Sequence, residues 1–372
     1  MARVPLTPAP PEDRYARQRL IPGWDQAALA TTTAVVVGVG ALGNEVAKNL
    51  ALAGVGRLIL CDPDTVAETN LSRTVLFGPS DVGRPKVTVA AERLHELAPG
   101  IRVETRRADL AAGVGLGELA DAGVVLGCLD SRRARLRLLG RAALVDAALV
   151  DGGTYAWGGE IRVRRAAADS CYGCSLSRGQ RAESDVPRGC ADTGSAGAAP
   201  ASVLATSLVA AWMTLSASRL LMARNGSATP PPYRLLRVDG LSGTTAPVSV
   251  FRDPECPYHH PLDGEIRSLP LGAEGTVAEL LALLPDGDDP WVWEGFAVSG
   301  PCRGCGLSYD PPTSGHGVAV CSRCGTANRV RRSDRARDAP LTARLRELGV
   351  ARGEILPART ARGDFRWYRM AT

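Results

Sequence analysis

The chain has 372 residues, 45% of them hydrophobic, which is enough for two domains with sizeable cores. Its net charge of +5 comes from interspersed Arg, Asp and Glu, so we expect neither nucleic acid nor a membrane surface as a partner. Prolines and an aspartate interrupt the N-terminal stretch, which therefore lacks a signal-peptide pattern, and we expect a cytoplasmic protein.

The first half of the chain alternates apolar strands and helices, which is typical of a parallel sheet covered by helices. We expect, in chain order, a strand and glycine turn at 34–43, a helix at 44–53, a strand at 57–61, a helix at 86–97, and strands at 101–105 and 124–129. Residues 169–200 are rich in Gly, Ser, Arg and Cys without a clear period, which indicates a crossover loop.

Residues 198–221 are apolar enough to suggest a membrane helix, but interspersed Ser and Thr residues favour a buried helix. After residue 261 the pattern starts again, with predicted helices at 276–284 and 342–348 and strands at 291–298 and 364–369. We therefore predict a larger α/β domain at 1–265 and a small mixed α/β domain at 266–372 with a cysteine-rich insert.

The glycine turn is the first functional candidate. Gly38, Gly40 and Gly43, with Ala41 between them, allow the backbone to approach a phosphate at the start of a helix, where the macrodipole favours negative charge. Asp62 follows at the distance expected for an acid that binds ribose hydroxyls. On these features alone an NAD-dependent oxidoreductase is the obvious interpretation, and tight strand-helix packing without any ligand is the plain alternative.

Charged residues downstream separate these alternatives. A carboxylate that attacks the α-phosphate of ATP expels pyrophosphate, and such a site needs cations on the phosphates and an acid that holds Mg²⁺. Arg73 and Lys86 are candidate cations, and Asp130 follows a buried strand. Hydride transfer would not require them, so we favour ATP with Mg²⁺.

Several linked motifs resemble the MoeB/ThiF family of ubiquitin-activating-like adenylating enzymes: Arg14-Tyr15-Ala16-Arg17-Gln18, the glycine turn, Ala53-Gly54-Val55-Gly56, Asp62-Pro63-Asp64, Asn70-Leu71-Ser72-Arg73, Val82-Gly83-Arg84-Pro85-Lys86 and Cys128-Leu129-Asp130. The resemblance implies a Rossmann-like adenylation domain with a mostly parallel sheet, in which Asp62 and Asp64 belong to the nucleotide site and Asp62 holds the ribose. It also implies the remaining roles: phosphate binding by Asn70, Arg73 and Lys86, Mg²⁺ at Asp130, and Arg17 reaching across a homodimer interface.

Not every residue follows the family pattern. Thr74 stands where the family often carries glutamine, which puts the detail of the phosphate contacts in doubt. Without the resemblance, Arg17 would be an ordinary surface charge, and Lys86 and Asp130 would be ordinary charges at a helix start and a strand end.

Ten cysteines include three C-x-x-C pairs, a spacing that suits metal ions better than disulfides. Cys171 and Cys174 stand where the family has the first half of a structural zinc site, and the second half here is Cys256 and His259. We predict a Cys₃His zinc site, with His260 as the substitute ligand and a degenerate site as the alternative.

A second zinc site is expected in the C-terminal domain. Cys302 and Cys305 are separated from Cys321 and Cys324 by fifteen residues, and a glycine follows each pair, which is zinc-ribbon spacing at about 300–326. A redox function is the weaker interpretation, because no strand-to-helix context places these cysteines at a helix N-terminus.

The remaining cysteines differ in setting. Cys61 and Cys128 lie in apolar strands and are expected to be inert core residues. Cys190 lies beside Arg188 and Gly189 in the polar loop. In the ubiquitin-like branch of the family a cysteine in this loop accepts the acyl group as a thioester, so we expect Cys190 to be the nucleophile; a loop thiol without chemistry is the alternative.

The leading hypothesis is adenylation of the C-terminal glycine of a ubiquitin-like or sulfur-carrier protein ending in Gly-Gly, with transfer to Cys190 or to an external sulfur donor or conjugating protein. The alternatives are adenylation of a peptide or small-molecule carboxylate, an NAD-dependent oxidoreductase, and a non-enzymatic zinc-binding adaptor that acts through residues 266–372.

Overall fold

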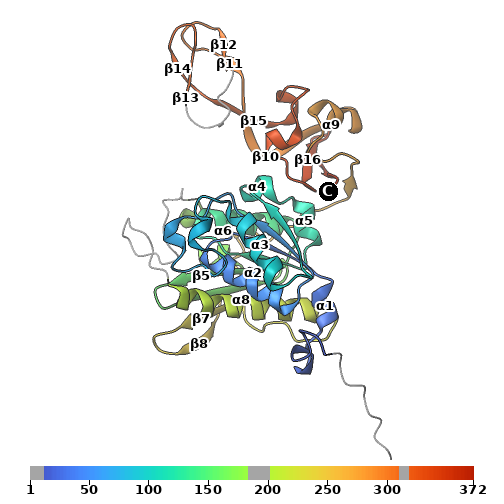
Figure 1. The fold of residues 1–372 in the computed structure, drawn as a ribbon. Helices are drawn as coiled ribbons and strands as arrows, with labels where there is room; N and C mark the ends of the chain where they lie inside the picture. The colour runs from blue at the N-terminus through green and yellow to red at the C-terminus, as the bar shows by residue number, and fades with distance from the viewer. Residues whose placement is uncertain (1–11, 183–201, 310–317) are drawn as a thin grey trace, which may run out of the picture. The chain divides into compact units, whose positions relative to one another are not determined.

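The computed structural model describes residues 12–182, 202–309 and 318–372, which form two compact units. The first unit comprises residues 1–107 and 119–261, and the second comprises residues 108–118 and 262–372. Figure 1 shows the helices and strands of both units. The sequence pattern did not indicate that residues 108–118 belong with the C-terminal part of the chain.

The first unit contains an eight-stranded sheet in the order β3-β2-β1-β4-β5-β6-β7-β8. The pairs from β3 to β5 are parallel and those from β5 to β8 are antiparallel. Its strands are β1 (Thr33–Val37), β2 (Arg57–Cys61), β3 (Arg102–Arg106), β4 (Val124–Gly127), β5 (Leu149–Tyr155), β6 (Gly158–Arg164), β7 (Leu235–Asp239) and β8 (Thr244–Val248). The predicted mostly parallel α/β sheet is confirmed.

Helices cover both faces of this sheet. On β5, a Cβ built on Gly152 would meet Met213 of α8 and Leu42 of α2, whereas the neighbouring Asp151 binds Arg135 of α6. Because side chains alternate between the faces of a strand, α2 and α8 cover one face and α6 covers the other. The helices of this unit are α1 (Gln26–Ala30), α2 (Ala41–Ala53), α3 (Lys86–Leu97), α6 (Arg132–Leu144), α7 (Arg178–Ala182) and α8 (Val203–Ala223).

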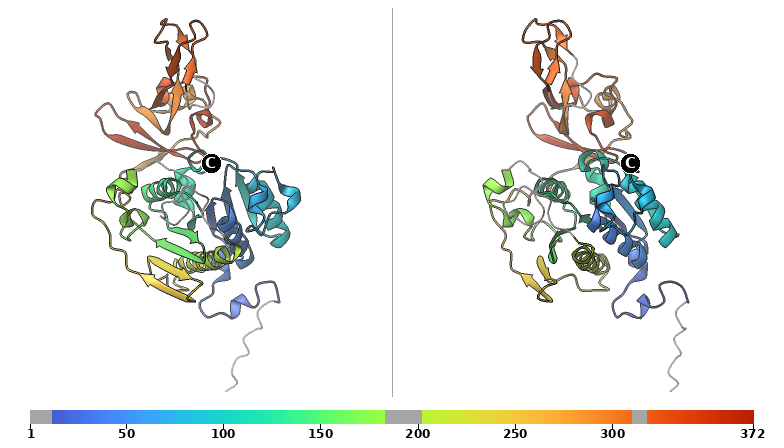
Figure 2. Two further views of the ribbon diagram at one scale, coloured as in Figure 1. Left: turned by 90° about the vertical axis from the view of Figure 1, so that its left-hand side faces the viewer. Right: turned by 60° about the vertical axis from the view of Figure 1, so that its left-hand side comes forward.

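Helix α8 is the apolar segment noted in the sequence. It is long and apolar enough to cross a membrane by length and composition alone. In this structure Val209, Ala210, Met213 and Ala217 are fully buried in the core of the first unit. Figure 2 shows the helix in yellow-green against the sheet. Because this face is buried against the sheet, a helix that covers the sheet has an apolar sequence like that of a membrane helix.

The second unit contains a five-stranded sheet in the order β15-β10-β16-β17-β9. Its strands are β9 (Ile266–Ser268), β10 (Asp289–Val298), β15 (Arg331–Arg335), β16 (Ile355–Arg359) and β17 (Phe365–Arg369). Helix α9 (Val277–Leu283) packs through Val277 and Leu280 into the core of this unit. Two short hairpins form the cysteine-rich insert: β11 (Gly300–Pro301) with β12 (Ser308–Tyr309), and β13 (Val318–Val320) with β14 (Ala327–Arg329).

The helix predicted at 342–348 forms only in part, as the short 3-10 helix Leu345–Leu348. The carbonyl oxygens of Leu341 and Ala343 instead accept hydrogen bonds from the amides of Ala278 and Val277, at 3.0 Å each. These bonds, together with a turn in which the Ala343 amide donates to the Pro340 carbonyl at 2.9 Å, hold residues 340–343 beside the start of α9. The segment 108–118, with helix α4 (Leu110–Gly113) and the start of α5 (Leu116–Asp121), joins the same unit through a 3.0 Å bond from the Leu116 amide to the Glu354 carboxylate.

Candidate functional site

The glycine turn lies where the connections of the sheet change direction. From β1 the chain proceeds through β2 to β3 on one side, and β4 then pairs with the opposite edge of β1. Ligands of such sheets bind outside the carboxyl ends of the strands at this switch point. The turn after β1, Asp62 after β2 and Asp130 after β4 all stand at these strand ends.

The three glycines of the turn have different surroundings. Gly38 has φ +87°, and a Cβ there would lie 2.4 Å from the carbonyl oxygen of Cys128. A Cβ on Gly43 would lie 1.9 Å from the carbonyl oxygen of Gly38. A Cβ on Gly40 would meet no heavy atom within 4 Å, and its φ of −76° suits any residue. Protein packing therefore accounts for Gly38 and Gly43 but leaves open space at Gly40.

Backbone amides face this open space at the start of α2. In the described chain the amides of Gly40, Ala41 and Leu42 donate to no protein acceptor, as is usual in the first turn of a helix. Together with the helix macrodipole they make the space at Gly40 suitable for a negatively charged group.

Asn44 holds the turn in place and was not among the residues selected from the sequence. Its side-chain amide donates to the carbonyl oxygens of Val39 at 2.9 Å and Gly40 at 3.1 Å, and its Oδ1 accepts the amide of Leu76 at 3.0 Å. Asn44 is fully buried. The signal available in the sequence was a polar residue directly after the glycine turn.

Asp62 and Lys86 come together beside the turn. Asp62 Oδ2 accepts the amide of Val39 at 2.7 Å, and its Oδ1 accepts the amide of Asp64 at 2.8 Å. Lys86 Nζ lies 2.8 Å from Asp64 Oδ2 and 4.0 Å from Asp62 Oδ1. Lys86 is buried although it begins α3, so its ammonium is directed by two carboxylates and does not extend into solvent.

The other predicted nucleotide residues make local contacts or none among the described residues. Arg73 Nη1 donates to the Thr69 carbonyl at 2.5 Å, and Asn70 Oδ1 accepts the Ala67 amide at 3.0 Å. Asp130 is exposed and has no hydrogen-bond or ion-pair partner among the described residues, which leaves its carboxylate available. Arg17 is also exposed. The roles assigned to these residues stay predictions.

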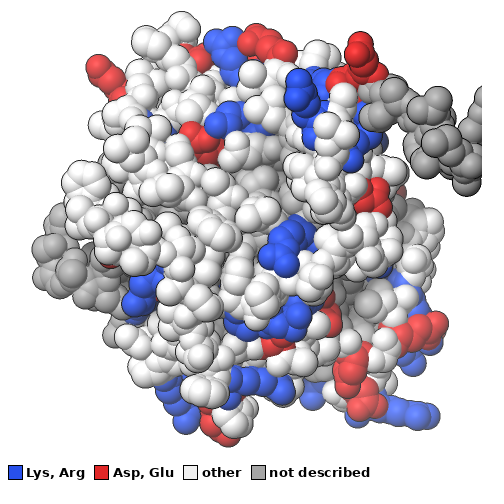
Figure 3. Space-filling view, turned by 90° about the horizontal axis from the view of Figure 1, so that it is seen from below, with Lys and Arg blue, Asp and Glu red and all other residues white. Residues whose placement is uncertain are grey.

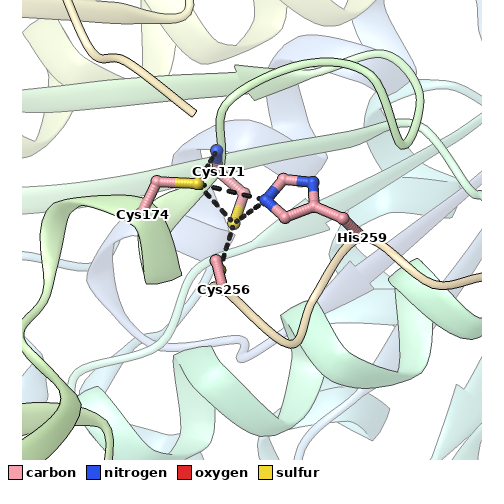
Figure 4. A group of neighbouring side chains, drawn as sticks. All are labelled: Cys171, Cys174, Cys256 and His259. Atoms are coloured by element: carbon pink, nitrogen blue, oxygen red, sulfur yellow. Dashed lines mark hydrogen bonds between the residues drawn. The ribbon is translucent and has the colours of Figure 1, made fainter. Parts of the chain in front are cut away.

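The first cysteine cluster brings together residues far apart in sequence. Cys171 Sγ lies 3.7 Å from Cys174 Sγ and 3.6 Å from Cys256 Sγ, and His259 Nε2 lies 3.1 Å from Cys174 Sγ. Figure 4 shows the four side chains pointing toward one another. Tetrahedral zinc with Zn–S bonds of about 2.3 Å places neighbouring sulfur atoms about 3.8 Å apart, so the donor set fits this ion.

The imidazole of His259 is oriented for such a site. Its Nδ1 lies 2.8 Å from the carbonyl oxygen of Ala167, so Nδ1–H donates there and the lone pair of Nε2 faces the sulfur atoms. Burial lowers the pKa of His259, which favours the neutral form that binds metals. Burial also raises the pKa of the Cys171 thiol, an effect that a bound cation would oppose.

The second cluster has the same compactness. The donor atoms of Cys302, Cys305, Cys321 and Cys324 all lie within 4.8 Å of one another. Burial opposes ionisation of Cys302, but hydrogen bonds, above all from the side chain of Asn328, lower its pKa to about 6. Asn328 is buried and also accepts the amide of Arg303 at 2.9 Å, so it orients the first loop of the ribbon.

Among the described residues, Cys61 and Cys128 belong to neither cluster. Cys190 lies outside the described residues. Cys61 is buried, and Cys128 is half-buried with its pKa raised by burial and by the Asp151 carboxylate. These surroundings suit an unreactive thiol.

The ThiF family matches residues 14–258 of this chain. The sulfur carrier protein adenylyltransferase of Thermus thermophilus is 33% identical over 253 residues, which cover 66% of this chain and 89% of that protein. The sulfur carrier protein ThiS adenylyltransferase of Escherichia coli is 30% identical, and the match covers 66% of this chain and 93% of that protein. A crystal structure of E. coli MccB with ATP is similar in fold, with a TM-score of 0.53 and 18% identity. The match covers 67% of this chain and 75% of that chain. The chain therefore belongs to the ThiF family.

Proposed function

We propose that this protein uses ATP to adenylate the C-terminal glycine of a ubiquitin-like or sulfur-carrier protein and releases pyrophosphate. The relatives named as sulfur carrier protein adenylyltransferases support this activity. The observation that carries the proposal is the open space at Gly40 beside the unpaired amides at the start of α2. Lys86 lies next to the same turn through Asp62, whose other carboxylate oxygen accepts the Val39 amide.

The residues at the switch point have different functions in the proposed reaction. The amides of the glycine turn and the cations of Lys86 and Arg73 bind the phosphates, and Asp62 binds the ribose in addition to holding the Val39 amide. Asp130 would hold Mg²⁺, which would neutralise phosphate charge. The carrier's C-terminal carboxylate enters beside Gly40 for in-line attack on the α-phosphate, and alignment of the reactants supplies a large part of the rate enhancement.

Exchange of labelled pyrophosphate into ATP tests this proposal. Exchange should require a carrier that ends in Gly-Gly and should disappear when the terminal glycine is removed from that carrier. Exchange driven equally well by a short peptide or a small carboxylic acid would refute a carrier substrate and identify the other class of acid. Binding of NAD in place of ATP would refute adenylation altogether.

Both cysteine clusters hold structural zinc in this proposal, one with Cys₃His and one with Cys₄ ligands. Zinc supplies folding energy at closed sites of this kind. A reducing compartment such as the cytoplasm keeps the eight ligand residues available. Two zinc ions per chain by elemental analysis are expected, and fewer than two would remove one assignment.

The acyl group passes from the adenylate to Cys190, to an external sulfur donor or to a conjugating protein. Intact-mass measurement after incubation with ATP, Mg²⁺ and the carrier distinguishes these routes. An adduct that thiols release, and that Cys190→Ala abolishes, supports a thioester. An identical adduct on the Cys190→Ala variant assigns the acceptor elsewhere.

The protein acts as a homodimer in this proposal, and the exposed face of α8 supports it. Leu204, Leu208 and Leu215 are spaced along one side of the helix, with exposed fractions of 64%, 44% and 45%. Figure 3 views the side of the first unit that carries α8, β7 and β8, where uncharged side chains occupy much of the surface. Exposed apolar stripes of this kind mark protein interfaces.

Subunit mixing tests the dimer and Arg17 together. Arg17→Ala and Asp130→Asn should each be inactive alone. A mixed dimer has one site with an intact Asp130 that receives Arg17 from the partner, so mixing should restore activity. Absence of restored activity in a dimer that exchanges subunits would place Arg17 in its own chain's site or outside any site.

A further inference from the structure

No side-chain contact with a described residue fixes the position of Asp130. The residues that hold the backbone of its turn therefore determine where its carboxylate lies. Asp130 lies in the turn between β4 and α6, and its side chain forms no hydrogen bond or ion pair with a described residue. On the strand side, the Cys128 amide donates to the Val37 carbonyl at 2.8 Å, which attaches the turn to β1. On the helix side, the Ser131 hydroxyl accepts the Ala134 amide at 3.2 Å and caps α6.

A buried ion pair brackets this turn. Arg135, in the first turn of α6, binds Asp151 of β5 through Nε at 2.9 Å and Nη2 at 2.5 Å. Asp151 pairs with Gly127, the last residue of β4, and a Cβ on Gly127 would lie 2.6 Å from its carboxylate. The guanidinium fork therefore attaches α6 to β5 at the point where β5 pairs with the end of β4, three residues before Asp130.

The ring of Tyr172 connects this ion pair to the first cysteine cluster. The guanidinium carbon of Arg135 lies 4.5 Å from the centre of the ring, and that of Arg162 lies 5.2 Å from it. Tyr172 stands directly between Cys171 and Cys174, two members of the cluster. A ring in this position moves with the cluster backbone and contacts the residue that anchors the turn of Asp130.

We propose that Arg135 positions Asp130 for Mg²⁺, and that Tyr172 makes this positioning depend on the metal-loaded cysteine cluster. The inference rests on the proposed function, because it assumes that Asp130 holds Mg²⁺. In this proposal the cysteine cluster has an effect besides its contribution to folding. An ordered cluster keeps the Tyr172 ring against Arg135, and Arg135 fixes the turn that presents the Asp130 carboxylate. Arg135 and Tyr172 are positioning residues, and neither contacts the nucleotide.

Tyr258 provides a matched control for Tyr172. It is also a half-buried tyrosine inside the cluster, between Cys256 and His259. Its ring lies against Gly173 and Gly140, where Cβ atoms would come within 2.5 Å and 3.5 Å of it. The ring that Arg135 contacts is that of Tyr172, whereas Tyr258 touches α6 farther along, at Gly140. Loss of the Tyr258 ring should therefore disturb the cluster with much less effect on the turn of Asp130.

The experiment compares Tyr172→Leu, Tyr258→Leu and the full-length wild type. Binding of Mn²⁺ as a probe for Mg²⁺ is followed by electron paramagnetic resonance with ATP present, and zinc content is measured by elemental analysis. We expect Tyr172→Leu to weaken Mn²⁺ binding about tenfold at unchanged zinc content, and Tyr258→Leu to stay within about twofold of wild type. Tyr172→Phe should restore wild-type binding, since it keeps the ring.

Separate outcomes overturn the inference and the proposed function. Equal Mn²⁺ binding by Tyr172→Leu and wild type, or an equal loss in Tyr258→Leu, overturns the inference. Asp130→Asn reports on its premise: if this variant binds Mn²⁺ as wild type does, Asp130 does not hold the ion and the inference also fails. Failure of the carrier to support pyrophosphate exchange would refute the carrier proposal alone, because the Mn²⁺ titration contains no carrier.

Discussion

Substitution of Gly40 by serine tests whether the open space in the glycine turn belongs to a ligand. The new Cβ meets no protein atom within 4 Å, and φ at this position is already −76°. Gly40 is also the N-cap of α2, a position where serine is at least as favourable as glycine. We therefore expect the free energy of unfolding to change by no more than about 0.5 kcal/mol.

Nucleotide binding should respond very differently to this substitution. A phosphate bound to the amides of the turn occupies the space that the serine side chain enters. Loss of one hydrogen bond to a charged group corresponds to about 1.5–3 kcal/mol, so ATP should bind roughly 10- to 100-fold more weakly. Isothermal titration calorimetry with MgATP measures the affinity, and urea denaturation measures the stability.

Two other glycines serve as controls for Gly40→Ser. Gly100 is exposed and also has no atom within 4 Å of an added Cβ, so Gly100→Ser should change neither stability nor ATP affinity. Gly43→Ser places a Cβ 1.9 Å from a carbonyl oxygen and should destabilise the protein by about 1–3 kcal/mol. Wild-type ATP affinity in a folded Gly40→Ser variant would refute the placement of the phosphates.

Lys86→Met should lower kcat/KM for ATP about 100-fold or more in steady-state exchange kinetics, because it removes a buried cation from the proposed phosphate site. Asp64→Asn removes the exposed partner of Lys86 and should cost no more than about 1 kcal/mol of stability in urea denaturation. Cys256→Ser and Cys321→Ser should each lose one zinc ion per chain by elemental analysis, and the double variant should lose both; a double variant that keeps one ion would contradict two independent sites. Glu104 has its pKa lowered from 4.5 to about 2: burial opposes ionisation, but hydrogen bonds and charges of Arg57 and Arg106 outweigh it. A lowered folded pKa stabilises the protein above pH 4.5 and the effect is lost as pH falls toward 2, so the urea midpoint of wild type should fall more steeply over that range than that of Glu104→Gln.

The parallel half of the first sheet could be predicted because each strand there is a short apolar run between helices. The predicted strand at 57–61 coincides with β2, and the predicted helix at 86–97 coincides with α3. The first unit's cysteine cluster was also predictable, although periodicity alone would not join Cys171 to His259. The family resemblance predicted that pairing, and the structure places Cys171 Sγ 3.6 Å from His259 Nε2.

Elements of the second unit were harder to predict because long-range hydrogen bonds decide their conformation. The sequence from 342 to 348 has a helical pattern, yet carbonyl groups just before and within it bind the amides at the start of α9. The segment 108–118 has the composition of an ordinary loop, with three glycines in five residues at 113–117. A Cβ on Gly115 would lie 2.3 Å from the carbonyl of Arg352, so the reason for these glycines is a contact 237 residues away in the sequence.

The glycine turn illustrates the same limit at the functional site. A motif of three glycines cannot distinguish glycines required by packing from one required by a ligand, because both requirements select the same residue. Only the neighbouring atoms separate them: Cys128 and Gly38 leave no room for Cβ atoms at two positions, and nothing occupies the third. Asp62 adds to this distinction, since its carboxylate holds the amide of Val39 and therefore fixes the turn before any nucleotide binds. A turn held by Asp62 and Asn44 with an open position at Gly40 would need little rearrangement to bind the phosphate proposed here.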